Sequence, residues 1–364
     1  MEPRFRGLGN ACDERGRCGR ALWVAMRLAV LQVKDELGRI GGVLPRLAVV
    51  FDSNVYRHLG RQAFAALRDL EIAHSVLGFA SHFVVREYLS HLADPSDPSF
   101  RPSLASLKRL WEHCHQYDGS REVLRFVADS EEQVAASLFG AEPQERDIAA
   151  EHYGALAGEL THSDPHTWAP YLPDLRAVRE YILISETQWV DALWRTAVLG
   201  INASAASWHD VTARTPLREE VVNRIRTGLG RGFVARAIAS RAATAAAHVA
   251  TPEQIDAAAS KVVEMFAPSV YLYDRLVQKV IVNGEDMSRY PNPNSLWDYQ
   301  ISFSTGRGAL VWGVPLILVS NDEDMLASGL ESGHGHRIMS FPAYLSLLSQ
   351  PSDDLWPLLD AYAP

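Results

Sequence analysis

The sequence has few cysteines, hardly any lysine and no long hydrophobic run. Its three cysteines in 364 residues are too few for a disulfide framework. The longest apolar stretches are too short to cross a bilayer or contain an arginine, and no secretory leader opens the chain. These absences predict a soluble, cytoplasmic protein with no membrane partner.

Positive charge is in the minority. The chain has 35 Lys and Arg against 44 Asp and Glu, a formal net charge of −9, which argues against a surface coated in basic residues. Apolar residues make up 47% and charged residues 22%, as in ordinary globular proteins. The length predicts either two domains or one core with a large elaboration.

Strands and helices alternate near both ends of the chain. Apolar, β-branched runs at 47–51, 74–80 and 314–319 predict buried strands, and the first is followed by a helical pattern at about 57–69. Such an order indicates an α/β fold with a central, mostly parallel sheet.

The middle of the chain has a different pattern. Strand signals are absent between 96 and 270, where helical spacing dominates and prolines mark the breaks. We therefore expect an α/β core, formed by 46–95 and 271–364, that is interrupted by an all-helical insertion at 96–270. Residues 1–45 are expected to be an extension that contains one helix.

Four acidic residues occupy positions that should converge. Asp52 and Asp322 each follow an apolar strand directly, and the carboxyl ends of parallel strands open on one crevice. Glu87, on the helix after the second strand, and Asp298, in the first turn of its own helix, can reach the same place.

A group of four carboxylates implies a cation, because the charges otherwise repel each other. Hard oxygen ligands select Mg²⁺ or Mn²⁺. Such a cation lowers the pKa of bound water and stabilises the charge that develops on a phosphate, so the residues predict phosphodiester hydrolysis.

These acids lie in four short motifs. The motifs are Val50-Phe-Asp52-Ser-Asn-Val55, Val84-Val-Arg-Glu87, Trp297-Asp298 and Val319-Ser-Asn-Asp322-Glu-Asp324. In this order and on these elements they resemble the motifs of the PIN domain (PilT N-terminus) nucleases, over roughly 47–95 and 285–348.

The resemblance implies a PIN-like three-layer core and a metal-dependent endoribonuclease. Asp52, Glu87, Asp298 and Asp322 are then the catalytic and metal-binding residues, with Asp286 as the alternative for the third acid. RNA is the implied substrate, and single-stranded DNA stays open.

Neighbours of the acids are expected to support them. Ser53 and Asn54 should orient the loop after the first strand, and Asn321 and Asp324 should support the loop after the last long strand. The four residues are therefore predicted to surround the metal ligands without being ligands.

The insertion carries the strongest basic stretch of the chain. It includes Arg224, Arg226, Arg231 and Arg236, which could bind the phosphates of a nucleic acid. A solvated helix face, or pairing with acidic groups of the protein, is an equal interpretation.

Two other functions compete with the nuclease. A haloacid-dehalogenase-like phosphatase also places acids after its strands, but it needs a second aspartate where this chain has Asn54. A non-catalytic interaction module is the other alternative, and homo-oligomers or an inhibitor or complex partner protein stay open. His113-Cys-His115 is expected to be structural and not a metal site, because no further Cys or His pair lies at zinc spacing.

Overall fold

The computed structural model describes residues 46–118, 121–127, 138–139, 144–194, 216, 219, 223, 229–282, 295–306, 310–311 and 314–350. The extension at 1–45, with its expected helix, lies outside these residues.

A five-stranded sheet forms the core of one lobe. Its strands are β1 (Leu47–Phe51), β2 (Val76–Phe79), β5 (Leu310–Val311), β6 (Val314–Val319) and β7 (Ile338–Met339). Their order is β2-β1-β6-β5, and β7 pairs with the carboxyl end of β6. Every pair is parallel except β5–β6, so the sheet is mostly parallel as predicted.

Helices surround the sheet and form a second lobe. Those of the sheet lobe include α2 (Ser53–His58), α3 (Arg61–Ala73), α4 (His82–His91), α5 (Phe100–Cys114), α14 (Ser295–Ser302), α15 (Glu323–Glu331) and α16 (Phe341–Leu348). The others are α7 (Gln144–His162), α8 (Leu172–Trp194), α11 (Leu229–Ala245), α12 (Pro252–Met265) and α13 (Ala267–Val282), with the 3₁₀ turns η1 (Pro165–Thr167), η2 (Ala169–Tyr171) and η5 (Phe303–Thr305). The architecture is α/β and compatible with three layers.

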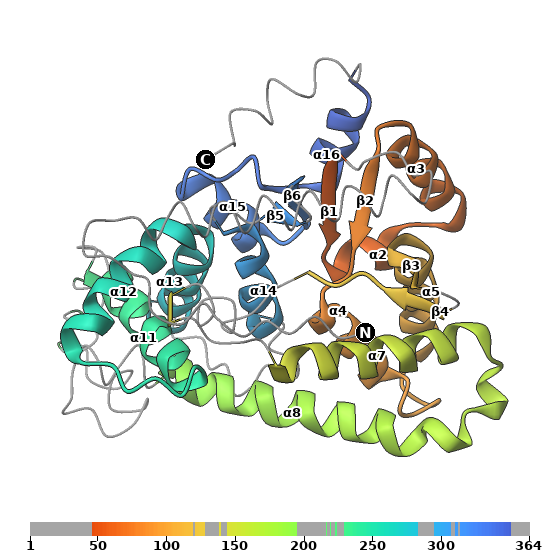
Figure 1. Ribbon diagram of the computed structural model, residues 1–364, viewed down its shortest axis with the longest axis horizontal. Coiled ribbons are helices and arrows are strands. Elements are labelled where there is room, and N and C mark those ends of the chain that lie inside the picture. Colours follow the sequence, from red (N-terminus) through yellow and green to blue (C-terminus); the bar gives the residue numbers. More distant parts are fainter. Residues whose placement is uncertain are drawn as a thin grey trace, which may run out of the picture.

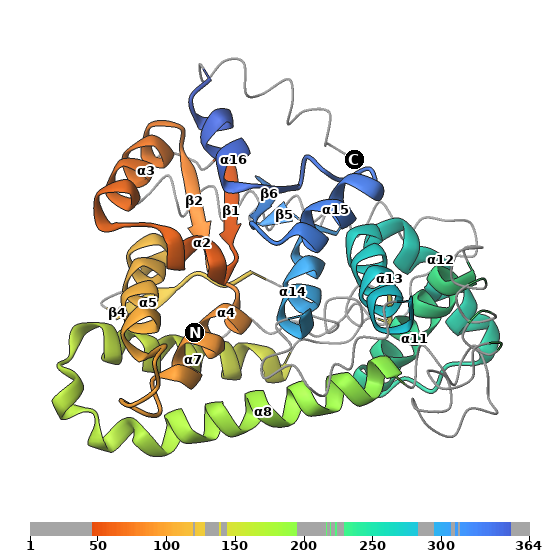
Figure 2. The same ribbon diagram turned by 180° about the vertical axis from the view of Figure 1, so that it is seen from behind.

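The two lobes are joined along one side by a long helix. Figures 1 and 2 show α11, α12 and α13 grouped beside the sheet lobe, with α8 running beneath both. Its 23 residues correspond to about 34 Å. Among the described helices, none combines the length and the apolar content that a membrane span requires.

The central strand is buried on both faces. All five residues of β1 are apolar and nearly inaccessible to solvent, which suits a strand covered by helices on either side. The ring of Phe51 packs against Tyr56 of α2, His113 of α5 and Tyr344 of α16, with centroids 5.4, 4.6 and 5.6 Å apart. Aromatic contacts therefore fix three helices to the middle of the sheet.

The single helix expected at 57–69 is in fact two. The α2 helix ends at His58, and α3 begins at Arg61 after an extended backbone at Leu59 and Gly60, with ψ of 115° and 158°. Glycine is a poor residue for continuing a helix, so the chain turns here.

The prediction of an all-helical insertion is wrong at its start. β3 (His115–Asp118) and β4 (Arg121–Leu124) form an antiparallel pair. Asp118-Gly119 is a sequence signal for a hairpin that the helical pattern concealed. The Arg125 carbonyl accepts a hydrogen bond from the amide of Ala80 at 2.7 Å, so the hairpin is attached to the end of β2.

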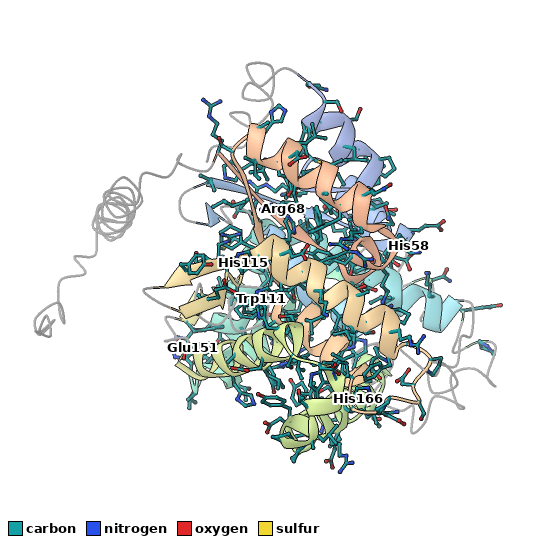
Figure 3. All side chains as sticks on the ribbon, turned by 90° about the vertical axis from the view of Figure 1, so that its right-hand side faces the viewer. His58, Arg68, Trp111, His115, Glu151 and His166 are labelled. Atoms are coloured by element: carbon teal, nitrogen blue, oxygen red, sulfur yellow. The ribbon has the colours of Figure 1, made fainter. Side chains whose placement is uncertain are left out.

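The next helix packs closely against α5. Gly158 of α7 lies against the ring of Trp111, and a Cβ at that position would be only 2.6 Å from the ring. Figure 3 shows Trp111 on α5 beside the helix that carries Glu151. This close approach depends on glycine.

A buried ionic network lies behind the sheet. The Glu71 carboxylate, fully buried, accepts hydrogen bonds from Arg68 at 2.8 Å, from Tyr344 at 2.9 Å and from His113 at 3.1 Å. Burial alone raises the pKa of Glu71, but the charges of His113 and Arg68 outweigh it and lower the pKa below the usual value. Glu71 is therefore an anion held by cations.

His113 is the cation at the centre of this network. Burial opposes its charge, but the Glu71 carboxylate raises the pKa of His113 to about 9. Its second ring nitrogen lies 2.7 Å from the Tyr56 hydroxyl, so both nitrogens are occupied. A Cβ at Gly78 of β2 would lie 2.5 Å from the imidazole, which explains glycine in this strand. His113 is thus structural, as expected.

Candidate functional site

The first acid lies where two parallel strands end together. Asp52 follows β1 and Ser320 follows β6, which are adjacent in the sheet, and the Asp52 amide donates to the Val319 carbonyl at 3.0 Å. The Ser320 hydroxyl donates to the Asp52 carboxylate at 2.8 Å. In Figure 1, β1 and β2 run toward α2 and α4 at this edge. Asp52 is only 5% exposed.

Asn54 connects the loops after β1 and β6. Its side-chain amide donates to Asp52 at 2.6 Å, and its oxygen accepts from the Asn321 amide at 3.2 Å. The backbone of Ser53 donates to Asp52 at 2.6 Å and accepts from the Tyr88 hydroxyl at 2.7 Å. Ser53, Asn54 and Asn321 therefore lie around Asp52, where supporting residues were expected.

The second acid, Asp322, caps α15. Its carboxylate accepts from the Met325 amide at 2.8 Å, and its own amide donates to the Ser320 hydroxyl at 3.0 Å. Ser320 thus contacts both Asp52 and the backbone of Asp322, and this short link holds the two acids at the same edge of the sheet.

Glu87 reaches the site from α4. It is 8% exposed, and its carboxylate forms an ion pair with Arg57 of α2 at 2.6 Å. The neighbouring Arg86 is used differently: its guanidinium lies over the rings of Tyr153 and Tyr181, 4.4 and 4.7 Å from their centroids. This stacking fixes α7 and α8 to the helix that carries Glu87.

Asp298 completes the set from the first turn of α14. Burial, followed by the charges of Asp52, Asp322 and Glu87, raises the pKa of Asp298 well above its usual value. Burial, and then the charge of Glu87, raises the pKa of Asp52 to about 7. The four predicted acids are therefore electrostatic neighbours; the alternative Asp286 lies outside the described residues.

Asp324 acts electrostatically on Asp298, as a residue near the acids was expected to do, and is itself held by the helical lobe. It forms ion pairs with Arg275 at 3.3 Å and with Lys279, both on α13. These pairs join α15 to the helical lobe, across the interface where α13 packs on α15. Asp324 thus connects the surroundings of Asp298 with α13.

The donor set suits a hard divalent cation, although its side chains are not gathered around a common point. Within the described part of the chain, no three His, Cys, Asp or Glu side chains lie close enough to hold a metal ion. Glu87 is turned toward Arg57, and Asp52 toward Ser320. Four carboxylates, with the pKa of Asp52 and of Asp298 raised by burial and then by the neighbouring negative charges, fit Mg²⁺ or Mn²⁺, which would have to compete with Arg57 for Glu87.

A fifth carboxylate comes from the insertion. Glu186 of α8, 7% exposed, accepts a hydrogen bond at 3.0 Å from the indole of Trp297, the residue before Asp298. Burial, together with the charge of Glu87, raises the pKa of Glu186, so it lies near the acids. Sequence reasoning missed it, because an acid on a long helix has no local feature that marks it.

Trp189 supports the same contact one turn further along α8. Its indole donates to Ser295 at 3.4 Å and stacks on Tyr299 with centroids 4.8 Å apart. Trp189 is buried in the core. Contacts to α14 on both sides of Asp298 in the sequence thus come from the insertion, which therefore holds Asp298 in place.

We expect Glu186→Ala to leave the indole N–H of Trp297 without its partner and to loosen α14. A buried unsatisfied donor costs about 1–3 kcal/mol, so the melting temperature should fall, and metal-dependent activity should fall about 10- to 100-fold as for other residues that orient ligands. Glu186→Gln keeps an acceptor and should restore much of both. The exposed Glu112→Ala is the control; equal losses in Glu186→Gln and Glu186→Ala would contradict this role.

Two of the four arginines that were predicted to bind nucleic acid, Arg231 and Arg236, are among the described residues. Arg231 lies 3.4 Å from Asp274 and over the ring of Tyr271, and Arg236 forms an ion pair with Asp256. Arg224 and Arg226 lie outside the described residues. For Arg231 and Arg236 the structure therefore shows the pairing with acidic groups that was the alternative interpretation.

No protein-family model, curated protein or solved structure matches the chain.

Proposed function

We propose that the protein is a divalent-metal-dependent endoribonuclease with a PIN-like core. One observation carries the proposal: Asp52, Glu87, Asp298 and Asp322 come from four separate elements and lie near one another at the carboxyl edge of a parallel sheet. Separate elements do not bring four buried or half-buried acids together for stability, since their repulsion opposes folding.

The residues have distinct roles in this proposal. The four acids would hold the cation, which when bound would supply an acidified water and neutralise charge on the phosphate. Ser320 and Asn54 orient the Asp52 carboxylate by donating to it, and the insertion orients Asp298 through Trp297. Arg57, whose side chain is 30% exposed beside Glu87, can pair with a substrate phosphate.

RNA as the substrate follows from the motifs that resemble PIN nucleases. The arrangement of the sheet supports the resemblance to these nucleases, because the first and last motifs lie at the ends of the adjacent strands β1 and β6. Asn54, at the position where a phosphatase of the haloacid dehalogenase type needs an aspartate, is engaged as a donor to Asp52. The nuclease is therefore the better supported hydrolase.

Metal dependence tests the proposal directly. Labelled single-stranded RNA should be cut by the purified chain in Mn²⁺ and left intact in EDTA, and titration calorimetry should detect Mn²⁺ binding. Asp322→Asn should weaken both, whereas Asp69→Asn, which changes an exposed acid on α3, should alter neither. Intact RNA in every lane together with absent Mn²⁺ binding would leave the interaction module as the remaining account.

A further inference from the structure

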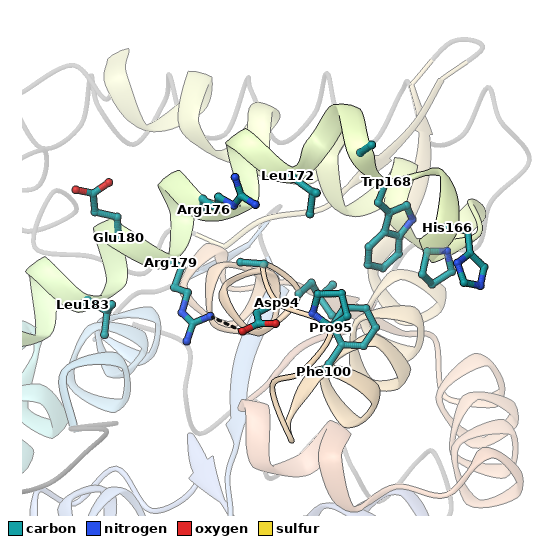
Figure 4. Close-up of a pocket in the computed structure, with 14 residues that line it drawn as sticks. Asp94, Pro95, Phe100, His166, Trp168, Leu172, Arg176, Arg179, Glu180 and Leu183 are labelled. Carbon is teal, nitrogen blue, oxygen red and sulfur yellow. Dashed lines mark ion pairs between the residues drawn. The ribbon is translucent and has the colours of Figure 1, made fainter.

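A pocket lies between α8, the 3₁₀ turns before it and the loop that joins α4 to α5. Its volume is about 620 Å³, within the range of small-molecule sites. Its floor is apolar and includes Leu92, Phe100 and Trp168, which are buried, with the two aromatic rings 5.8 Å apart. Figure 4 shows Phe100 and Trp168 close together on one side of the pocket.

The rim of the pocket has exposed basic residues. Arg176, Arg179 and His166 line it, against Asp94 and Glu180. Figure 4 shows Arg179 directed toward Asp94, whereas Glu180 points away from Asp94. Within the described part of the chain Arg176 forms no ion pair, so the rim favours an anionic group.

Arg179 is only loosely held by its acidic neighbour. Its guanidinium is 4.0 Å from the Asp94 carboxylate, at the outer limit of an ion pair. Asp94 is already satisfied by Ser96, whose hydroxyl and amide donate to it at 2.7 and 2.9 Å. An incoming anion can therefore engage Arg179 at little cost.

The pocket shares its two helices with the acidic site. Leu92 lies just past the end of α4, the helix that carries Glu87, and Leu183 precedes Glu186 by three positions on α8, a rise of about 4.5 Å along the helix axis. His91, between the pocket and Glu87, acts electrostatically on Glu186. Glu186 in turn contacts Trp297, the residue before Asp298, so α8 carries both a wall of the pocket and a contact to the acidic site.

We propose that this pocket binds a nucleotide of single-stranded RNA that neighbours the cleaved phosphodiester. The inference rests on the proposed nuclease function and assigns a substrate contact to a part of the insertion that no motif indicated. The face of a base packs on the apolar floor, and a phosphate pairs with Arg176 and Arg179. A protein partner or a free small molecule fits the combination less well, because the pocket lies beside a site for phosphodiesters.

Equilibrium binding of a fluorescein-labelled ten-nucleotide RNA, in EDTA and at low salt, tests the pocket without cleavage. The variant Arg176→Glu/Arg179→Glu should weaken binding at least 10-fold. Two lost phosphate contacts should also reduce the slope of log K against log salt by about 1.4. The control Arg61→Glu/Lys261→Glu makes the same change in charge at exposed positions on α3 and α12 and should change binding less than 3-fold.

The outcomes separate the pocket from the nuclease. RNA binding that is weakened equally in both double variants, or unchanged in the pocket variant, contradicts the proposed role of the pocket. Mn²⁺-dependent cleavage by the wild type would still support the nuclease in that case. If only the pocket variant binds RNA more weakly, and the wild type never cleaves RNA, the result supports the pocket and contradicts the nuclease. Where the wild type cleaves, the pocket variant should raise KM at least 10-fold and leave kcat within 3-fold.

Discussion

Asp52→Asn is expected to remove Mn²⁺-dependent cleavage of RNA and to stabilise the metal-free fold at pH 8. Loss of a residue that merely orients a metal ligand costs about 10- to 100-fold, so loss of a ligand should cost at least about 100-fold. The stabilisation follows because the Asp52 carboxylate is buried beside Glu87, and both effects disfavour its charge.

The pH dependence of this effect has a definite sign. The pKa of Asp52 is about 7 in the folded protein and 3.8 in the unfolded chain, so the folded state holds an extra proton between these values. The contribution of Asp52 to the free energy of unfolding therefore falls as pH rises from 4 to 7. An asparagine does not titrate, so the variant does not lose this free energy. The pKa difference sets a ceiling of about 4 kcal/mol. Ser320 and Asn54 both donate hydrogen bonds to Asp52, and the NH₂ group of an asparagine cannot accept one. The expected stabilisation of the variant is therefore reduced to about 1–2 kcal/mol.

Urea unfolding in EDTA at pH 5 and pH 8, monitored by circular dichroism, measures this effect. The free energy of unfolding of Asp52→Asn relative to the wild type should increase from pH 5 to pH 8, and that of Asp69→Asn should not. A variant that is destabilised at pH 8, or that still cleaves RNA in Mn²⁺ at the wild-type rate, would contradict the role of Asp52.

Glu71→Gln is expected to lower the free energy of unfolding by about 3 kcal/mol at pH 7, because it removes the anion that keeps His113 charged in the core. The pKa of His113 is about 9 in the folded protein and 6.5 in the unfolded chain. Its contribution is therefore complete below pH 6.5 and is lost as pH rises through 9.

Denaturant unfolding between pH 6 and pH 10 measures the loss. The wild type should lose about 3 kcal/mol from this pair over that window, and Glu71→Gln should have a much flatter profile. Glu151→Gln, on the exposed face of α7 in Figure 3, should follow the wild type. An unchanged slope in Glu71→Gln would show that His113 is not charged in the fold.

The buried strands β1 and β6 were predicted correctly from local sequence. The all-apolar run of β1, and the run of β6 that ends at Ser320, identify buried parallel strands because both faces are covered. Parallel strands that are neighbours end at one edge, so the sequence alone was enough to place Asp52 and Asp322 together.

The features that depend on distant contacts were not predictable. The pairing of Glu87 with Arg57 and of Trp297 with Glu186 joins residues 30 and 111 positions apart, and no local pattern carries that information. Likewise Arg231 looked like a phosphate ligand, because its partner Asp274 is 43 positions further along the chain. The β3–β4 pair is the exception, since Asp118-Gly119 was a local signal.

The position of β1 between β2 and β6 has a consequence for synthesis of the protein. Asp52 and Ser320 are in contact across 268 positions of sequence. At 5–20 residues per second, a ribosome takes about 15–50 s to add the partner strand after β1. During that time one edge of β1 has unpaired amide and carbonyl groups, which are a template for wrong pairing. A nascent chain that stops before residue 314 therefore lacks β6 and β7. It has an unpaired edge on β1 and only part of its acidic cluster, because Asp322 is missing.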